Sequence, residues 1–353
     1  MSAATPAIVL GGTGYVAGEL MRLIAGHPQL EAAAILSDSQ PGVPVAAAFP
    51  HLRSAYPTLK FSGLGQLEAV LRGAPRAALF SAAPHGAAAA IIDRLLTAAA
   101  AGGTRVHCVD ISADFRYSSA GAYEAVYKHA HGAPDRIHEF TCAVPEHLRK
   151  SPTPHVAHPG CFATATLLAT VPLLALGLTD SRLFVTGITG STGSGRKPVE
   201  GTHHPLRHSD LYSYGALSHR HVPEIVACAK LATGIEAELN FVPHSGPFAR
   251  GIHVTVQATL KKSIGTAAAI EALQSYYRDC PFVHVGTAAP RVKDVVTSNY
   301  SHLSAVTNGN SIAVMSVLDN LTKGAAGGAI QWMNRLLGLD ETTGLTAAAP
   351  GWT

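Results

Sequence analysis

The chain has 353 residues, of which 47% are hydrophobic and 14% are charged, and its formal net charge is +3 with neutral histidines. This length exceeds the size at which one hydrophobic core stops growing, and the apolar content excludes a disordered protein, so the sequence predicts two domains. The charge is too small and too dispersed for a nucleic-acid-binding protein, and no apolar segment predicts a membrane span. A weakly positive surface is compatible with an anionic small-molecule ligand.

The cysteines and the N-terminus bear on the compartment. Five widely spaced cysteines contain no CxxC pair, which argues against a disulfide framework or a thiolate zinc site. The first residues lack the basic region of a signal peptide, so we expect a cytoplasmic protein. Histidines cluster between His203 and His221, but the segment lacks an HExxH helix, and we expect no metal site.

A short apolar strand at 7–10 leads into a glycine-rich loop, and a helix is predicted behind it at 19–24. The spacing Gly12-x-Gly14-x-x-Ala17 fits the dinucleotide fingerprint, in which small residues let the backbone approach a pyrophosphate at a helix N-terminus. The alternative is a structural glycine turn. The residues that we expect to contact a dinucleotide are Gly11, Gly12, Thr13, Gly14, Tyr15 and Val16.

Strands and helices then alternate. Strands are predicted at 31–36, 77–80 and 105–111, and helices at 67–71 and 87–101. This alternation predicts a Rossmann-type doubly wound parallel sheet, whose carboxyl edge binds ligands. Ala82 and Pro84 follow the third strand at that edge. At the end of the second strand, Ser37 would leave room for the 2′-phosphate of NADP whereas Asp38 would favour NAD, and we prefer NADP.

A turn at Pro159 and Gly160 precedes an apolar run that predicts a buried helix over 164–174. Cys161 should therefore lie at or just before the first turn of that helix. Unsatisfied N–H groups and the helix dipole favour a thiolate there, and the thiolate is the reactive form of cysteine. Cys161 is our candidate nucleophile; the alternative is an inert cysteine that caps a core helix.

The second half of the chain has longer strands, at 183–189, 237–242, 252–260 and 311–317, and a helix at 267–277. Grouped strands with few helices predict a second, mostly antiparallel domain of α+β type. We expect a cofactor-binding domain over 1–157 that is completed by a C-terminal helix over 322–353. A catalytic and dimerisation domain would occupy 158–321.

One polar segment contains His219, His221 and Glu224. A histidine near neutrality can exchange a proton with a thiol or a carbonyl oxygen, and Glu224 could orient its ring. If either histidine lies near Cys161, the two form an activated nucleophile with its base. The alternative is a polar loop in which Glu224 only complements the dipole of the next helix.

Four cations lie in loops rich in glycine, serine or aspartate: Arg116, Arg196, Lys197 and Arg250. Cations in such loops suit carboxylate or phosphate oxygens, and arginine offers a bidentate fork. Solvated surface charges are the alternative for each of them.

Seven segments, in this order, resemble the N-acetyl-gamma-glutamyl-phosphate reductase family of arginine biosynthesis and together span nearly the whole chain. They are 11–20, 110–116, 158–164, 190–197, 219–225, 250–252 and 319–327. Two departures from the family pattern are Ala17, in place of a glycine, and Cys142-Ala143-Val144-Pro145-Glu146, where Tyr-Gly-Leu-Pro-Glu is usual.

The resemblance implies an NADPH-dependent reduction of an acyl phosphate through a Cys161 thioester, with His221 or His219 as the proton shuttle. It implies that the four cations hold anionic groups of the substrate and the leaving phosphate. It also places further residues at the cofactor: Gly190, Ser191, Gly193, Asn320 and Gly324. Symmetry base rates favour a homodimer or homotetramer. The alternatives are a sister reductase acting on carrier-linked aminoadipyl or glutamyl phosphate or on aspartyl phosphate, and a regulator that binds NADP without turnover.

Overall fold

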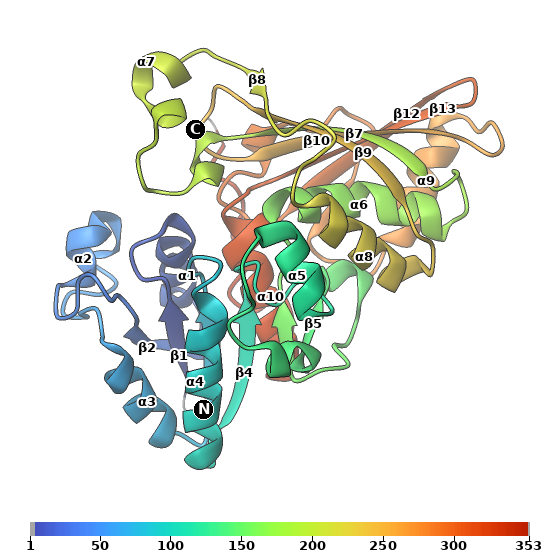
Figure 1. Ribbon diagram of the computed structural model, residues 1–353. Helices are drawn as coiled ribbons and strands as arrows, with labels where there is room; N and C mark the ends of the chain where they lie inside the picture. The colour runs from blue at the N-terminus through green and yellow to red at the C-terminus, as the bar shows by residue number, and fades with distance from the viewer. Residues whose placement is uncertain (1–3, 352–353) are drawn as a thin grey trace. The chain divides into compact units, whose positions relative to one another are not determined.

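A computed structural model describes residues 4–351 of the chain, which form two compact units (Figure 1). The first unit comprises the described residues up to Cys142, Lys150–His158 and Ala329–Leu345. The second comprises Ala143–Arg149, Pro159–Gly328 and the described residues from Thr346 onward. The chain therefore passes five times from one unit to the other.

The first unit is built on a six-stranded sheet with the strand order β2-β1-β3-β4-β6-β5. Its strands are β1 (Thr5–Leu10), β2 (Leu30–Ile35), β3 (Arg76–Ser81), β4 (Arg105–Asp110), β5 (Phe140–Cys142) and β6 (His155–Ala157). All neighbouring strands are parallel. The central strands are apolar at consecutive positions because both faces of the sheet are covered. The predicted Rossmann-type parallel sheet is confirmed.

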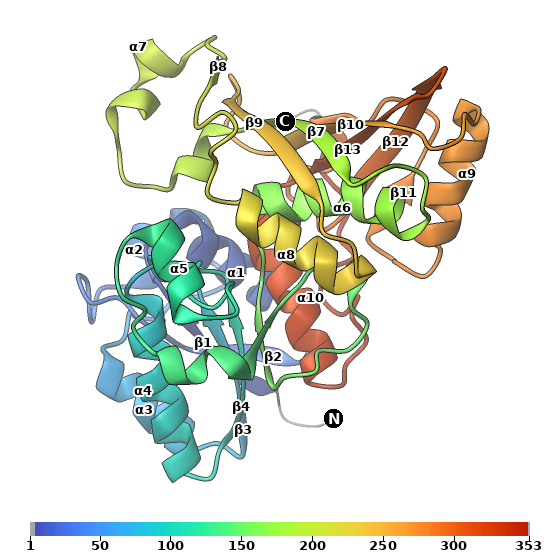
Figure 2. The ribbon, with the colours of Figure 1, turned by 45° about the vertical axis from the view of Figure 1, so that its right-hand side comes forward.

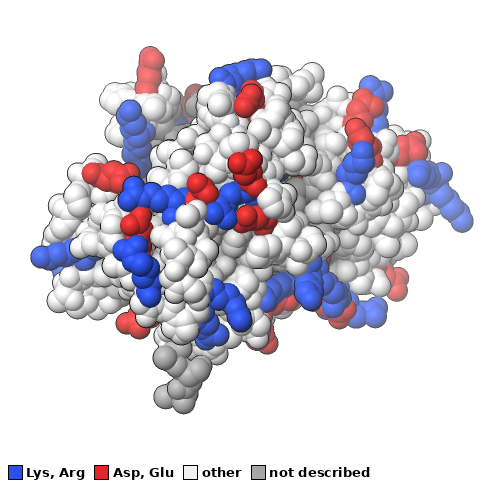
Figure 3. All heavy atoms as spheres, turned by 60° about the horizontal axis from the view of Figure 1, so that its bottom comes forward, with Lys and Arg blue, Asp and Glu red and all other residues white. Residues whose placement is uncertain are grey.

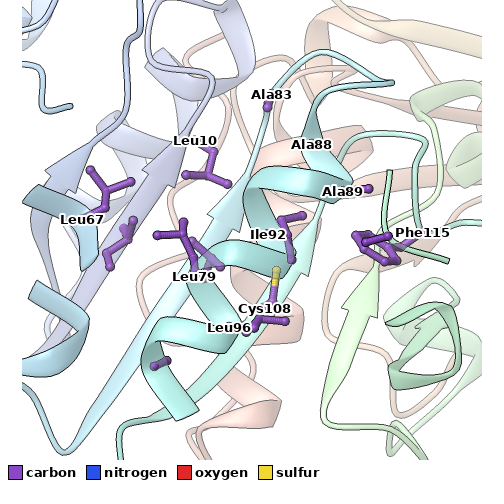
Figure 4. Close-up of a cluster of buried hydrophobic side chains, with 14 of the residues drawn as sticks. Leu10, Leu67, Leu79, Ala83, Ala88, Ala89, Ile92, Leu96, Cys108 and Phe115 are labelled. Atoms are coloured by element: carbon purple, nitrogen blue, oxygen red, sulfur yellow. The ribbon is translucent and has the colours of Figure 1, made fainter. Parts of the chain in front are cut away.

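The helices that follow these strands are α1 (Tyr15–Ala25), α2 (Val45–Ala48), α3 (Leu64–Arg72), α4 (Ala88–Ala101) and α5 (Ala120–Tyr127). Short 3-10 helices lie at Pro50–Leu52 and Pro134–Glu139. Figure 4 shows Ile92 and Leu96 of α4 close to Leu79 of β3 and Cys108 of β4, all in one buried apolar cluster. This cluster fixes α4 on the sheet and so fixes the loop that leads into it.

Several helices differ in their bounds from the sequence-based expectation; those expected at 67–71 and 164–174 each begin three residues earlier. The helix expected at 19–24 begins at Tyr15, because Gly14 is already its N-cap. The helix expected over 322–353 is shorter: α10 (Gly327–Leu336) ends before Gly338, which has a φ of +72°. A left-handed glycine ends helices, and the chain continues in turns as far as Gly351. Residues 1–3 and 352–353 of the expected domains lie outside the described residues.

The second unit contains a seven-stranded sheet with the order β11-β12-β13-β10-β7-β9-β8. Its strands are β7 (Arg182–Thr189), β8 (Tyr212–Ser213), β9 (Glu238–Ser245), β10 (Ile252–Thr259), β11 (Val283–Val285), β12 (Ser301–Asn308) and β13 (Ser311–Leu318). Two of its pairings, β11 with β12 and β7 with β9, are parallel, and the other four are antiparallel. The predicted, mostly antiparallel second domain is confirmed.

The helices of the second unit are α6 (Cys161–Ala175), α7 (His204–Arg207), α8 (Val222–Thr233) and α9 (Thr266–Tyr276). Its short helical turns are 3-10 helices at Pro145–His147, Ser191–Ser194, Glu200–Thr202 and Val292–Asp294 and a π-helical turn at Thr322–Ala326. Helix α6 packs against β10, β13 and α8, and Figure 2 shows it along one face of the sheet beside α8. Its residues 162–174 are all buried, which explains why it is apolar on every side.

Two further features are the charge of one face and the hydropathy of the helices. On the face drawn in Figure 3, Lys and Arg side chains are interspersed with Asp and Glu, so its charge is mixed. Among residues 4–351, no helix has both the length and the apolar character that crossing a membrane requires.

Candidate active site

Cys161 is the first residue of α6, as predicted, and Gly160 is the N-cap. The thiol-bearing residue is half-buried. The Gly160 carbonyl accepts a hydrogen bond from the Thr164 amide at 2.8 Å and another from the Thr164 hydroxyl at 3.1 Å, which closes the first turn. The positive end of a helix whose residues 162–174 are buried therefore lies at the cysteine, where it favours a negative charge.

His221 lies directly over the backbone that precedes the cysteine. A Cβ atom built on Gly160 would be 2.7 Å from both Cε1 and Nε2 of the His221 ring, so only glycine permits this approach. His221 is the N-cap residue of α8. The packing of α8 on α6 thus brings an imidazole against the residue that precedes Cys161, and both Cys161 and His221 line the same cavity.

Glu224 joins the same two helices. Its carboxylate is fully buried, and Oε1 accepts a hydrogen bond from the Gly160 amide at 2.9 Å. It satisfies one of the N–H groups at the end of α6 and fixes the register of the first turn of α8. Glu224 thus binds the N-cap of the helix that begins at Cys161, and its expected role in orienting a histidine ring stays a prediction.

His219 contacts His221 through its ring. Its Nδ1 accepts a hydrogen bond from the His221 amide at 3.3 Å, and the two rings are 4.7 Å apart and nearly perpendicular. Phe162, Tyr214 and Phe241 pack edge-on around it. Burial, aided by the charge of Arg220, lowers the pKa of His219 to about 4, so its ring is neutral at pH 7. An imidazole with this pKa is a weak base near neutrality.

A cavity of about 490 Å³ opens beside Cys161 within the second unit, a volume suited to a small metabolite. Its lining consists of Cys161, Phe162, Thr189, Gly193, Ser194, Tyr212, Tyr214, Gly215, Ser218, His219, Arg220, His221 and Ser245. Burial raises the pKa of the Tyr214 hydroxyl and the nearby Cys161 raises it further, so this phenol stays protonated. It can therefore donate a hydrogen bond into the cavity.

Arg220 is a cavity residue that the sequence analysis did not assign. It lies between the two histidines of the His219-Arg220-His221 segment and lines the same cavity. Its position in that segment was the signal available from the sequence. An exposed guanidinium at this place offers a bidentate partner for a carboxylate or phosphate.

The four predicted cations occupy other places in the described structure, and none of them lines this cavity. Arg250 forms an ion pair with buried Asp319 at 2.5 Å and also donates to Thr322 at 2.8 Å. Arg116, in the first unit, is buried and donates to the carbonyls of His158 and Ile111. Arg196 and Lys197 are exposed on the loop that follows β7.

The glycine-rich loop after β7 is held by hydrogen bonds to two other segments of the second unit. The amides of Ser191 and Thr192 donate to the carbonyls of Phe248 and Ala249, each at 2.9 Å. Asn320 accepts from the Gly251 amide at 2.7 Å and donates to the Thr192 hydroxyl at 3.0 Å. The predicted residues Gly190, Ser191, Gly193 and Asn320 are therefore neighbours, and Gly193 reaches the cavity.

Gly324, also predicted, contacts the nucleophile's own backbone. A Cβ atom built on Gly324 would lie 2.8 Å from the Cβ and 3.1 Å from the Cα of Cys161. The π-helical turn that carries Gly324 therefore packs directly on the start of α6.

The predicted dinucleotide residues meet at the carboxyl edge of the first unit's sheet. Gly11 has a φ of +84°, and a Cβ on it would collide with the backbone of Ala82; a Cβ on Gly12 would collide with the Leu36 carbonyl. By contrast, the space at Gly14 is open, since the nearest atom to a Cβ there is 3.5 Å away. The first turn of α1 has no acidic residue, so its N–H groups fit a pyrophosphate.

The remaining predicted residues of the first unit adjoin this loop. Thr13, Tyr15 and Val16 are partly or fully exposed around Gly14. Ser37 is buried at the end of β2, with its hydroxyl 3.5 Å from that of Ser39. The Pro84 carbonyl accepts the amides of Ala87 and Ala88 at the entry of α4. Their contact with a dinucleotide stays a prediction.

Comparisons with known proteins agree with this arrangement. The semialdehyde dehydrogenase NAD binding domain matches residues 6–151, and the semialdehyde dehydrogenase dimerisation domain matches residues 161–320. N-acetyl-gamma-glutamyl-phosphate reductase 1 of Pseudomonas putida is 39% identical over 96% of this chain and 97% of its own length. The reductase of Pseudomonas aeruginosa is 40% identical over 97% of this chain and 98% of its own.

Solved structures with the same fold include aspartate semialdehyde dehydrogenase II from Vibrio cholerae, with a TM-score of 0.69 and 15% identity over 96% of this chain and 99% of that one. Another is the aspartate semialdehyde dehydrogenase of Candida albicans with NADP, with a TM-score of 0.65 and 14% identity over 95% and 99%. At such identities the likeness concerns the fold. From the family models and the full-length relatives, the chain belongs to the semialdehyde dehydrogenase family, together with the N-acetyl-gamma-glutamyl-phosphate reductases.

Proposed function

We propose that this protein reduces N-acetyl-gamma-glutamyl phosphate to N-acetylglutamate 5-semialdehyde and phosphate with NADPH, in arginine biosynthesis. One observation carries the chemistry: Cys161 begins α6 beside a cavity, with the His221 ring over the residue before it. The names of relatives that match nearly the whole chain at 39–40% identity support the acyl group. A reducing cytoplasm suits the reaction, because the nucleophilic thiol must stay reduced.

The first half of the reaction uses Cys161 and His221. His221 takes the thiol proton, and the thiolate forms a bond to the acyl carbon. The bond from that carbon to the phosphate oxygen breaks, and His221 returns its proton to the departing phosphate. The product of this step is a thioester on Cys161. The protonated Tyr214 phenol is placed to donate a hydrogen bond to the acyl oxygen as it gains negative charge.

The second half releases the aldehyde. When bound, NADPH supplies the hydride that reduces the thioester carbon. The carbon–sulfur bond then breaks, the aldehyde leaves with the hydride that the carbon has gained, and the Cys161 thiolate takes up one proton from solvent. Thiolate suits both steps because it is a good nucleophile and a good leaving group.

The cofactor would be held in the first unit by the loop after β1, with Gly11, Gly12, Thr13, Gly14, Tyr15 and Val16, and by Ala82 and Pro84. We assign Gly190, Ser191, Gly193, Asn320 and Gly324 to its reactive end, on the side of the thiol. The choice of NADP over NAD rests on Ser37, whose small hydroxyl leaves room for a 2′-phosphate.

The substrate would be held by cations. Arg220 lines the cavity and is the cation that we assign to the carboxylate of the acyl group. We also propose that the four other cations bind anionic groups of the substrate and the leaving phosphate. They are Arg116, Arg196, Lys197 and Arg250.

We infer a homodimer or homotetramer formed through the second unit, whose family model is described as a dimerisation domain. Phe184, Gln257, Ala313 and Val306 lie opposite one another in a row across four adjacent strands. Phe184 is 51% and Val306 50% exposed, so this sheet face presents apolar side chains to solvent. A Phe184→Glu variant should dissociate in sedimentation experiments.

The reverse reaction tests the function. N-acetylglutamate 5-semialdehyde, NADP and phosphate should form NADPH, measured by absorbance, and omission of phosphate should abolish it. Aspartate semialdehyde and carrier-linked semialdehydes in the same assay would identify a sister reductase instead. No turnover with any of them, together with a Cys161 that iodoacetamide alkylates slowly, would favour a regulator that only binds NADP.

A further inference from the structure

The second unit buries an ion pair that the proposed chemistry does not use. Lys323 Nζ lies 2.6 Å from Glu146 Oε1, and the two side chains are 0% and 1% exposed. Lys323 belongs to the π-helical turn, and Glu146 to the 3-10 helix Pro145–His147. Charges buried this deeply lose their hydration, so each requires the other as its partner.

Three further side chains lie around the pair: Phe282, whose ring centroid is 5.5 Å from Lys323 Nζ, and His147 and Tyr277, which are hydrogen-bonded to each other. His147, next to Glu146, is 3.0 Å from the Tyr277 hydroxyl, which itself donates to the Leu168 carbonyl at 2.7 Å. Since Tyr277 uses its proton on Leu168, His147 donates Nε2–H to the phenol oxygen. Burial lowers the pKa of His147 to about 4, so it is neutral at pH 7 and supplies no competing charge for Glu146.

The pair is one residue away from the contact with the nucleophile. Lys323 precedes Gly324, whose backbone packs on Cα and Cβ of Cys161. The turn is anchored at its start by Asp319, which accepts the amides of Leu321 and Thr322 at 2.8 Å. Lys323 anchors its middle. A π-helical turn is rare and is frequent at functional sites, and here it sets the position of Gly324.

The path of the chain adds an independent observation. Residues Ala143–Arg149 belong to the second unit, although the chain on both sides of them belongs to the first. The chain therefore leaves one unit for seven residues and places Glu146 against a lysine that is 177 positions away in sequence. This excursion is what completes the pair.

We propose that Glu146 and Lys323 are positioning residues that hold Gly324 against Cys161 and so keep the thiol in its reactive orientation. This inference rests on the proposed role of Cys161 as the nucleophile. The pair acts through backbone placement: a displaced turn would let the first residue of α6 move, and small displacements of a reacting group cost large factors in rate.

The test compares the full-length protein with Glu146→Gln, Lys323→Met and the double variant. Each single change leaves one buried charge without its partner and should lower the midpoint of thermal unfolding. The double variant removes both charges and should recover that midpoint. If the pair positions the thiol, the double variant still alkylates severalfold more slowly at Cys161, followed by peptide mass spectrometry, and its kcat falls about tenfold or more.

Tyr277→Phe is the matched control, because it removes buried hydrogen bonds to His147 and Leu168 without touching the Gly324 turn. It should lower stability but leave the Cys161 alkylation rate unchanged. If the double variant also has a lowered midpoint, its Cys161 alkylation rate is compared with that of Tyr277→Phe. Each rate is then measured at the same number of degrees below the midpoint of that variant. Equal alkylation rates in that comparison, or recovery of wild-type alkylation and kcat by the double variant, would overturn the inference.

The proposed function is tested separately with Cys161→Ser. Full turnover by that variant would refute the covalent step itself. An inactive Cys161→Ser variant together with a fully reactive double variant would refute only the positioning role of the pair.

Discussion

Oε1 of Glu224 accepts a hydrogen bond from the amide of Gly160 at 2.9 Å, which ties the first turn of α8 to the N-cap of α6. Glu224 is fully buried, and the ring of His221 rests on the same glycine. One carboxylate therefore links the start of α8, where His221 lies, to the residue before Cys161.

Glu224→Ala should weaken both stability and turnover. It leaves the Gly160 amide without its charged acceptor, and loss of such a bond costs about 1.5–3 kcal/mol in the free energy of unfolding. The kcat should fall by about tenfold or more, because His221 and Cys161 lose their common anchor. Denaturant unfolding and steady-state kinetics measure the two effects. Glu224→Gln, which keeps an acceptor oxygen, should be the milder change; equal effects of the two would contradict this role.

The two histidines should differ in their kinetic effect. His221→Asn should lower kcat by about 10²- to 10⁴-fold, the range found for general acid–base groups. His219→Asn keeps an acceptor for the His221 amide and should cost less than about tenfold, because His219 positions its neighbour. Larger losses in His219→Asn than in His221→Asn would reverse the assignment.

Stability should fall as the pH falls from about 6.5 to about 4. Burial lowers the pKa of His219, His147 and His155 to about 4, whereas an unfolded histidine titrates near 6.5. In this window the unfolded chain binds more protons than the folded one, so acid favours unfolding. Asp110, whose pKa burial raises to about 6, acts in the opposite direction below that pH. It is outnumbered, because burial also lowers the pKa of His27, His253 and His302.

Thermal midpoints across this pH range provide the measurement. His219→Asn removes one of these groups and should show a shallower decline than the unmodified protein. Parallel curves for the two proteins would exclude His219 from this effect.

Gly324→Ala should displace the nucleophile. The added Cβ would lie 2.8 Å from the Cβ of Cys161, a separation that real Cβ atoms do not adopt, so α6 or the π-helical turn must move. We expect kcat and the rate of Cys161 alkylation to fall by about tenfold or more. Gly265→Ala, at the N-cap of α9, has no atom within 4 Å of its new Cβ and serves as the control. Equal kinetics of the two variants would exclude a tight contact at Gly324.

Arg220→Met should raise the KM for the acyl phosphate more than Arg196→Met or Lys197→Met. Arg220 lines the cavity beside Cys161, whereas the other two are exposed on the loop after β7. Loss of a charged partner for a carboxylate is expected to raise KM by about tenfold or more. The opposite order would indicate that the loop, rather than the cavity wall, holds the substrate.

Several features of the fold follow from local signals that the sequence carries. The glycine loop after β1 was predictable from its spacing of glycines. The structure gives the reason for two of them, because a Cβ atom on Gly11 or Gly12 would collide with neighbouring backbone. The position of Cys161 followed from the Pro159-Gly160 turn and the apolar run behind it. Strand β12 was missed because it is largely polar, although its two-residue turn to β13 contains Gly309 with a φ of +59°. A glycine in such a turn was a usable hairpin signal.

The sequence by itself therefore determined the parallel sheet, the mostly antiparallel second sheet, the dinucleotide loop and the buried helix behind Cys161, since periodicity and turn chemistry act over a few residues. Only the tertiary structure decided that the His221 ring lies against Gly160, the residue before Cys161, because that depends on how α8 packs on α6. It also decided that Glu146 meets Lys323 across 177 positions. Such pairings depend on how completed helices and strands pack together, and no local pattern encodes that.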